Sequence, residues 1–265
     1  MKHGLMNKLI AHRGGKYIGL ENTKEAFQGA INLGYYGIEL DIQPTKDGRL
    51  VVFHDLNIKR LANVDMNIID CEWDYLKTVL LTKVEVDQQT YHGHIMLFKD
   101  FLNLIKNTQC RAFIEMKETF STFYVHQMFE IIESSGIDKN QIIIIANLAS
   151  ISILIEIRKI NQDIKLQFVA KTDYRNYLDD CIKYQIDLDI SKSIYLENKE
   201  EFIDNIKRFH ENGLEVNCWV VDDTALLKEL EEIGVDYITT DSVNYPPLNR
   251  SGGFLSKPAY PPVTQ

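Results

Sequence analysis

The stretch Leu9-Ile10-Ala11-His12-Arg13-Gly14-Gly15 decides between two folds for this chain. A short apolar strand ends in a histidine, an arginine and a glycine pair, which together favour a turn. A doubly wound open sheet would carry a Gly-x-Gly-x-x-Gly turn after its first strand, and no such turn follows here. The stretch therefore favours a closed barrel, in which reactive side chains stand at the carboxyl ends of the strands.

Outward from this stretch, short β-branched runs alternate with longer helical patterns. Strands are predicted at 8–11, 37–42, 50–53, 112–115, 141–146, 164–170, 186–190, 215–221 and 236–240. Helices are predicted at 23–33, 123–134, 151–160, 175–184, 199–211 and 224–233, and several end at a glycine that suits a left-handed cap. Alternation over about eight core strands predicts a (β/α)8 TIM barrel.

Two segments do not follow the alternation. Residues 56–94 are long, partly polar and lie between the second and third barrel strands, so we expect a small insertion after the second strand. Residues 249–265 are rich in proline and glycine, which predicts an extended C-terminal tail. The chain is thus predicted to be one catalytic barrel over residues 1–248, followed by a Pro-rich tail.

The composition narrows the class of protein. The chain is 45% hydrophobic, and its formal net charge is −9, from 38 acidic and 29 Lys and Arg residues. No basic block stands out, which disfavours nucleic-acid binding. No apolar signal region or membrane span is apparent, so we expect no stable membrane insertion and predict a cytoplasmic location. Reduced, packed thiols are expected at the four scattered cysteines, Cys71, Cys110, Cys181 and Cys218.

Two carboxylates lie two residues apart in the predicted strand that contains Glu39 and Asp41. Side chains two apart on a strand share a face, which in a barrel strand is the interior. Two unpaired anions are costly to bury there, and a hard divalent cation such as Ca²⁺ or Mg²⁺ relieves their repulsion. The alternative is an exposed edge strand, and this stretch alone favours neither reading.

Three further strand ends carry reactive side chains. His12 and Arg13 end the first strand, His54 ends another apolar run, and Glu115 precedes Lys117 on the same face. Each pattern alone also suits a packed histidine or a surface ion pair. Together they give two histidines for proton transfer, three carboxylates for a metal and two cations for an anion. That inventory suits hydrolysis of a phosphate ester.

Several stretches, in order along the chain, resemble the glycerophosphodiester phosphodiesterase family. They are His12-Arg13-Gly14, Glu21-Asn22-Thr23, Glu39-Leu40-Asp41, Thr45-Lys46-Asp47-Gly48 and Val51-Val52-Phe53-His54-Asp55. Ile114-Glu115-Met116-Lys117, Trp219 and residues 234–241 extend the match over nearly the whole barrel. The N-terminal block is a highly specific signature of this family.

The resemblance implies a TIM barrel that hydrolyses glycerophosphodiesters to sn-glycerol 3-phosphate and an alcohol. By position, the residues that would bind one divalent cation, Ca²⁺ or Mg²⁺, are Glu39, Asp41 and Glu115. The acid–base pair would be His12 and His54, with His12 favoured as the base. The substrate-binding residues would be Arg13 and Lys117 on the phosphate, Glu21 shaping the site, and Trp219 against the glycerol.

Several questions stay open at this stage. Asp222 and Ala146-Asn147 depart from the family pattern, which leaves the preferred alcohol undecided. Apolar residues such as Trp73 in the insertion would also suit a lysophospholipase D or a phospholipase C-like enzyme on the same barrel. A barrel that binds phosphodiesters without cleaving them is the third alternative. His92-Gly93-His94 is interpreted as a solvated loop rather than a metal site.

Overall fold

A closed ring of eight parallel strands forms the centre of the molecule. The computed structural model describes residues 8–16, 18–85, 88–117, 120–147, 151–171 and 173–241. The ring consists of β1 (Leu9–Ala11), β2 (Gly37–Pro44), β7 (Arg111–Met116), β8 (Ile142–Asn147), β9 (Lys165–Ala170), β10 (Asp187–Ser191), β11 (Val216–Trp219) and β12 (Tyr237–Thr240). Because β1 pairs with both β2 and β12, the ring is closed. The predicted TIM barrel is confirmed, and the predicted tail at 249–265 lies outside the described residues.

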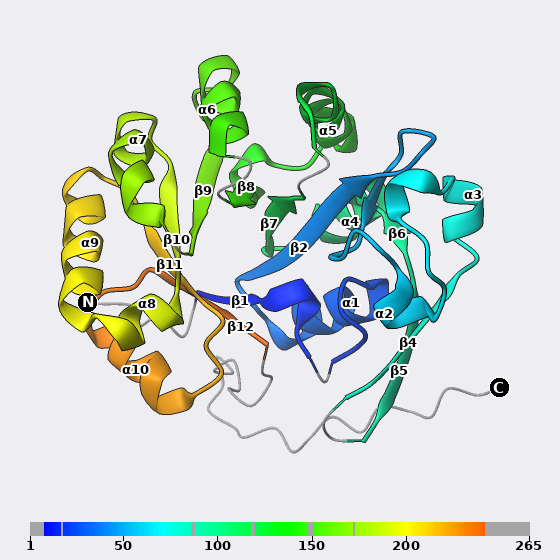
Figure 1. Ribbon diagram of the computed structural model, residues 1–265, viewed down its shortest axis with the longest axis horizontal. Helices are drawn as coiled ribbons and strands as arrows, with labels where there is room; N and C mark the ends of the chain where they lie inside the picture. The colour runs from blue at the N-terminus through cyan, green and yellow to red at the C-terminus, as the bar shows by residue number, and fades with distance from the viewer. Residues whose placement is uncertain are drawn as a thin grey trace.

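Helices cover the outside of this ring (Figure 1). They are α1 (Lys24–Leu33), α4 (Phe98–Ile105), α5 (Thr122–Ser135), α6 (Ile151–Ile160), α7 (Leu178–Lys183), α8 (Lys192–Glu197), α9 (Lys199–Glu211) and α10 (Thr224–Glu232). A 3₁₀ turn, Tyr174–Tyr177, forms the first part of the helix predicted at 175–184. The patterns did not predict α4 or α8.

The period of two along each strand separates the barrel interior from the outer core. In β2, Ile38 and Leu40 are fully buried in the large core beneath the helices, which also contains Phe27 of α1 and Phe101 of α4. Burial of each such side chain contributes about 1.5–3 kcal/mol to folding. A smaller apolar cluster fills the barrel interior: Ile10, Phe113, Ile143, Ile145, Val169 and Tyr237. The interior is therefore a packed core, and the polar side chains gather at the carboxyl ends of the strands.

The chain leaves the barrel between β2 and β7 and builds a small layer on one side of it, at the right of Figure 1. This layer contains β3 (Leu50–Val52), α2 (Lys59–Ala62), a 3₁₀ turn (Ile68–Asp70), α3 (Trp73–Leu76), the hairpin β4 (Leu80–Val84) and β5 (Thr90–His94), and β6 (Met96–Leu97). A core of its own holds it together, including the buried Phe53, Ile58 and Leu76. Trp73 packs against that core rather than standing free.

Strand β3, in the predicted run 50–53, lies outside the ring and pairs antiparallel with the end of β2. Its direction follows from the turn at Gly48, whose positive φ of 73° reverses the chain immediately after β2. The interpretation of His92-Gly93-His94 as a loop is wrong, because this run lies in β5. Gly93 allows β5 to pack closely on the start of α1, since a Cβ there would lie 2.6 Å from Thr23 Cγ2.

Candidate active site

Three carboxylates meet at the carboxyl ends of β2 and β7. Glu39 and Asp41 share the inward face of β2, and Asp41 is in register with Glu115 of β7. One oxygen of each lies within 4.8 Å of the others. Burial raises the pKa of Glu39 well above its usual range, and the charges of Asp41 and Glu115 raise it further. A positive charge at this point would relieve that repulsion.

Two cations lie against the carboxylates. Lys117 Nζ lies 2.8 Å from Asp41 Oδ1 and 3.1 Å from Glu115 Oε1. Arg13 Nε lies 3.6 Å from Asp41 Oδ2. Burial opposes ionisation of Asp41, but Lys117 and Arg13 outweigh it and hold its pKa well below the usual range. Asp41 therefore stays charged at neutral pH.

The donor set fits a hard divalent cation. Asp41 Oδ1 is buried and accepts no hydrogen bond from the described residues, although Lys117 lies close enough for an ion pair. Glu39 and Glu115 offer further carboxylate oxygens within reach of the same point. Oxygen ligands of this kind are those that Ca²⁺ and Mg²⁺ prefer.

The turn after β1 positions His12 and Arg13. Arg13 adopts a left-handed φ of 52°, and its backbone N–H donates to Glu39 Oε2 over 3.0 Å. Gly14 follows with a φ of 88°, and a Cβ at this position would lie 2.8 Å from Ala26 Cβ. Only glycine satisfies both demands without strain. The strained turn thus places two reactive side chains beside the carboxylates.

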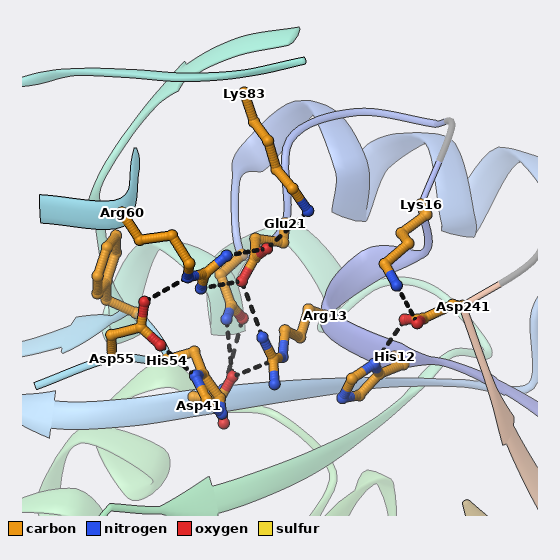
Figure 2. A network of polar contacts seen from close by, with 12 residues as sticks. His12, Arg13, Lys16, Glu21, Asp41, His54, Asp55, Arg60, Lys83 and Asp241 are labelled. Atoms are coloured by element: carbon orange, nitrogen blue, oxygen red, sulfur yellow. Dashed lines mark hydrogen bonds and ion pairs between the residues drawn. The ribbon is translucent and has the colours of Figure 1, made fainter. Parts of the chain in front are cut away.

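Each of the two candidate histidines is held by an aspartate. His12 Nδ1 lies 2.6 Å from Asp241 Oδ1, and since a carboxylate only accepts, the imidazole N–H donates. His12 Nε2 then faces the carboxylates, 3.9 Å from Glu39 Oε2. The other oxygen of Asp241 forms an ion pair with Lys16 (Figure 2). Burial opposes ionisation of Asp241, but His12 and Lys16 lower its pKa to about 2.

His54 follows β3, the strand that pairs antiparallel with β2, and reaches the same site from there. Its Nδ1 donates to Asp55 Oδ1 over 2.6 Å, and Asp55 in turn accepts from Arg60 Nε over 2.5 Å. Burial lowers the pKa of His54, and the charges of Lys117 and Arg13 lower it further against the opposing effect of Asp41. The imidazole is therefore neutral at pH 7.

Glu21 does not join the carboxylate cluster but holds cations around it (Figure 2). Arg60 donates two hydrogen bonds of 2.7 Å to its carboxylate, and Arg13 Nη1 donates one of 2.9 Å. Lys83 of β4 lies 3.3 Å away. Burial opposes ionisation, yet these cations hold the pKa of Glu21 far below its usual range. Glu21 thereby links the layer outside the barrel to the orientation of Arg13.

A cavity of about 440 Å³ opens at this end of the barrel. Seven of the nine predicted site residues line it: His12, Arg13, Glu39, His54, Glu115, Lys117 and Trp219. Asp41 and Glu21 lie behind that lining and act on it through Arg13 and Lys117. The opposite wall is formed by β8–β12 and includes Lys171, Asp189 and Thr239. Trp219 is fixed there, since its Nε1 donates to the Asp189 carbonyl over 3.1 Å.

The patterns assigned no role to four residues that the structure places at the site. Asp241 lies 229 positions from His12, and Arg60 and Lys83 belong to the layer outside the barrel. Asn22, within the Glu-Asn-Thr run, adopts a left-handed φ of 58° and donates to Asp41 Oδ2 over 2.8 Å. Only Asn22 and Asp241 carried a signal, because both belong to stretches that resemble the family.

Two wider properties bear on the setting of this site. The four cysteines are free and buried. Across the described ranges, every helix falls short of the length and apolar character that a membrane crossing requires.

Comparison with known proteins gives a family match over most of the chain. The model of the glycerophosphoryl diester phosphodiesterase family matches residues 12–245. A glycerophosphodiester phosphodiesterase of Caldanaerobacter subterraneus is 26% identical over 235 residues, which cover 88% of this chain and 93% of that protein. The human protein Lysophospholipase D GDPD1 is 38% identical over 113 residues. The chain spans only 36% of the length of this human relative.

Solved structures share the fold over nearly their whole length. A glycerophosphodiester phosphodiesterase from Thermotoga maritima has a TM-score of 0.73 at 24% identity, covering 91% of this chain and 96% of that one. A phosphodiesterase from Oleispira antarctica, in complex with the product sn-glycerol-3-phosphate, has a TM-score of 0.71 at 19% identity. It covers 91% of this chain and 94% of its own. At these identities the likeness establishes the barrel fold.

Proposed function

The chain belongs to the glycerophosphoryl diester phosphodiesterase family, and on this premise we propose that it hydrolyses glycerophosphodiesters to sn-glycerol 3-phosphate and an alcohol. One observation carries the proposal: one cavity is lined by two histidines, two of three clustered carboxylates and the cations Arg13 and Lys117. The Oleispira neighbour holds this product, sn-glycerol-3-phosphate. A small molecule of this class fits a cavity of about 440 Å³.

Metal dependence forms part of this proposal. Glu39, Asp41 and Glu115 would hold one divalent cation, either Ca²⁺ or Mg²⁺. A bound cation supplies charge stabilisation at the phosphate oxygens. Arg13 and Lys117 bind the same anionic group, and their ion pairs with Asp41 keep both side chains aimed at it.

The two histidines would carry the protons. One imidazole accepts a proton from the nucleophile, and the other donates to the leaving alkoxide. The nucleophile is water, or it is the glycerol hydroxyl of the substrate, in which case a cyclic phosphate forms and water then opens it to glycerol 3-phosphate. The lowered pKa of His54 leaves it neutral and supports His54 as the acceptor. His12 would then donate to the leaving alkoxide through Nε2, which faces the carboxylates while Asp241 holds Nδ1. This order is the reverse of the one that the sequence favoured.

Four variants test the assignment. His12→Ala, His54→Ala and Glu39→Gln should each fold, as measured by circular dichroism, and lose nearly all release of glycerol 3-phosphate. The matched control is His92→Ala, whose imidazole contacts Thr82 outside the cavity and whose loss should leave turnover unchanged. Substantial turnover by either histidine variant of the cavity would remove that histidine from the mechanism. Failure of the wild-type protein to cleave any glycerophosphodiester with Ca²⁺ or Mg²⁺ would overturn the function itself.

A lysophospholipase D activity is the second candidate. Leu56 lines the cavity with 42% of its surface exposed, and the human relative carries this activity in its name. An apolar side chain at the mouth would contact a lipid tail. Assays of water-soluble glycerophosphocholine against lysophosphatidylcholine micelles separate the two substrates. We also keep the cytoplasmic location as a proposal, because four unpaired cysteines suit a reducing compartment.

A further inference from the structure

The barrel interior beneath the cavity contains polar side chains on four successive strands. They are the buried Gln167 of β9, Asp189 of β10, Asn217 of β11 and Thr239 of β12. Asp189 is in register with Asn217, whose amide donates to Thr239 Oγ1 over 2.9 Å. One oxygen each of Gln167, Asp189 and Asn217 has no hydrogen-bond partner among the described residues. Buried acceptors of this kind are costly unless a ligand or an ordered water satisfies them.

Asp189 brings one of these unpartnered oxygens to the cavity. It lines the cavity although it is only 5% exposed, and the unpartnered atom is Oδ1. Thr239 lines the cavity as well, and because its oxygen already accepts from Asn217, its hydrogen is left to donate. Arg13 and Lys117, which would bind the phosphate, line the same cavity. A small group attached to that phosphate would therefore meet an acceptor and a donor side by side.

The chemistry of the Asp189 carboxyl suits a neutral partner. Burial raises its pKa well above the usual range, the charge of Glu115 raises it further, and a hydrogen bond from Asn217 opposes the shift. A hydroxyl group suits this carboxyl in either protonation state, because a hydroxyl can both donate and accept. A cationic group would bind well only to the ionised form.

We propose that Asp189 binds a hydroxyl group on the glycerol half of the substrate, with Asn217 and Thr239 holding it in place. The inference rests on the proposed function and adds a specificity-determining residue to that site. Every glycerophosphodiester contains the glycerol half, so every substrate would satisfy the buried oxygen. An alcohol such as choline has no free hydroxyl once it is esterified. Asp189 would thus recognise glycerol, while Arg13 and Lys117 act on the phosphate.

Isothermal titration calorimetry with two phosphates tests the assignment without relying on turnover. sn-Glycerol 3-phosphate and n-propyl phosphate differ only in the hydroxyl groups. We expect the wild-type protein to bind sn-glycerol 3-phosphate at least about tenfold more tightly, and Asp189→Leu to reduce this ratio about tenfold, because leucine has a similar size but no polar atom. Asp189→Asn keeps an oxygen acceptor and should retain most of the preference. Gln167→Leu removes another unpartnered oxygen from a residue outside the cavity lining, and should leave the ratio as it is.

The outcomes separate this inference from the proposed function. Equal binding of the two phosphates by the wild-type protein overturns the inference, as does a ratio in Asp189→Leu within twofold of the wild type. An equal loss in Gln167→Leu overturns it too. If Asp189→Leu loses affinity for choline and keeps its preference for sn-glycerol 3-phosphate, the carboxyl binds a cationic alcohol instead. None of these results touches the proposed function, which is overturned only if the wild-type protein cleaves no glycerophosphodiester.

Discussion

Replacement of Asp241 by asparagine isolates the contribution of one carboxylate to His12. Asp241 Oδ1 lies 2.6 Å from His12 Nδ1, and the low pKa of about 2 keeps the carboxylate charged at every working pH. Asparagine preserves the size of the side chain but removes the charge that stabilises the imidazolium. Its amide can also donate to Nδ1 and so favour the wrong tautomer of the ring.

The expected loss of kcat follows from the hydrogen bond between Asp241 and His12. A hydrogen bond to a charged group contributes about 1.5–3 kcal/mol, and tenfold in rate corresponds to about 1.4 kcal/mol. We therefore expect Asp241→Asn to lower kcat about 10- to 100-fold. KM should change little, because Asp241 does not line the cavity. If the carboxylate only supported the fold, its loss would lower the thermal stability and would not lower kcat at an unchanged KM.

The assay combines kinetics with nitrogen NMR. Release of glycerol 3-phosphate gives kcat and KM, and the ¹⁵N shifts of His12 report which ring nitrogen carries the proton. Asp236→Asn is the matched control, since Asp236 Oδ2 lies 2.7 Å from His210 Nε2 on the exposed outside of the barrel. The reasoning is refuted if kcat of Asp241→Asn stays within threefold of the wild type. Equal losses in the two variants refute it too.

Three further changes test separate parts of the structure. A divalent cation at 100 times its dissociation constant should stabilise the protein by about 2.7 kcal/mol in thermal unfolding. Glu115→Gln should largely abolish that gain. If the cation does not stabilise the wild-type protein, the carboxylates do not form a cation site. Arg60→Met should raise KM about tenfold by releasing the bidentate hold on Glu21, whereas Lys59→Met on the same helix should leave KM unchanged. Burial raises the pKa of Asp187 from 3.8 to about 6, so the folded protein keeps a proton that the unfolded chain loses, and stability falls between about pH 4 and 6. Asp187→Asn should lack this fall, which is about 3 kcal/mol in urea unfolding, and equal pH profiles of the two proteins would exclude the assignment.

The barrel strands could be predicted because the alternation of residue types along each strand is a local property of the sequence. Alternation along Gly37–Pro44 places Glu39 and Asp41 on one face and the apolar residues on the other, whatever lies elsewhere in the chain. The carboxylate cluster follows from that spacing together with Glu115 at the end of β7, the neighbouring strand. Residues 50–53 pair antiparallel with β2, because the tight turn at Gly48 reverses the chain between the two strands.

The supports of the site could not be predicted, because they depend on how distant segments pack. Arg60 reaches Glu21 only after the layer outside the barrel has folded around its own core. Asp241 reaches His12 only after β12 pairs with β1. Neither contact leaves a spacing or a periodic pattern in the sequence. A single chain offers no local signal for such pairs.

The pairing of β1 with β12 also determines when the site can assemble during translation. His12 leaves the peptidyl transferase centre early, but the aspartate that orients its ring is added 229 residues later. At roughly 5–20 residues per second, about 10 to 45 seconds of synthesis separate the two. A chain that is still being translated thus already contains its histidines and carboxylates while β1 has no β12 to pair with. The contact between His12 and Asp241 would therefore form only after β12 has paired with β1.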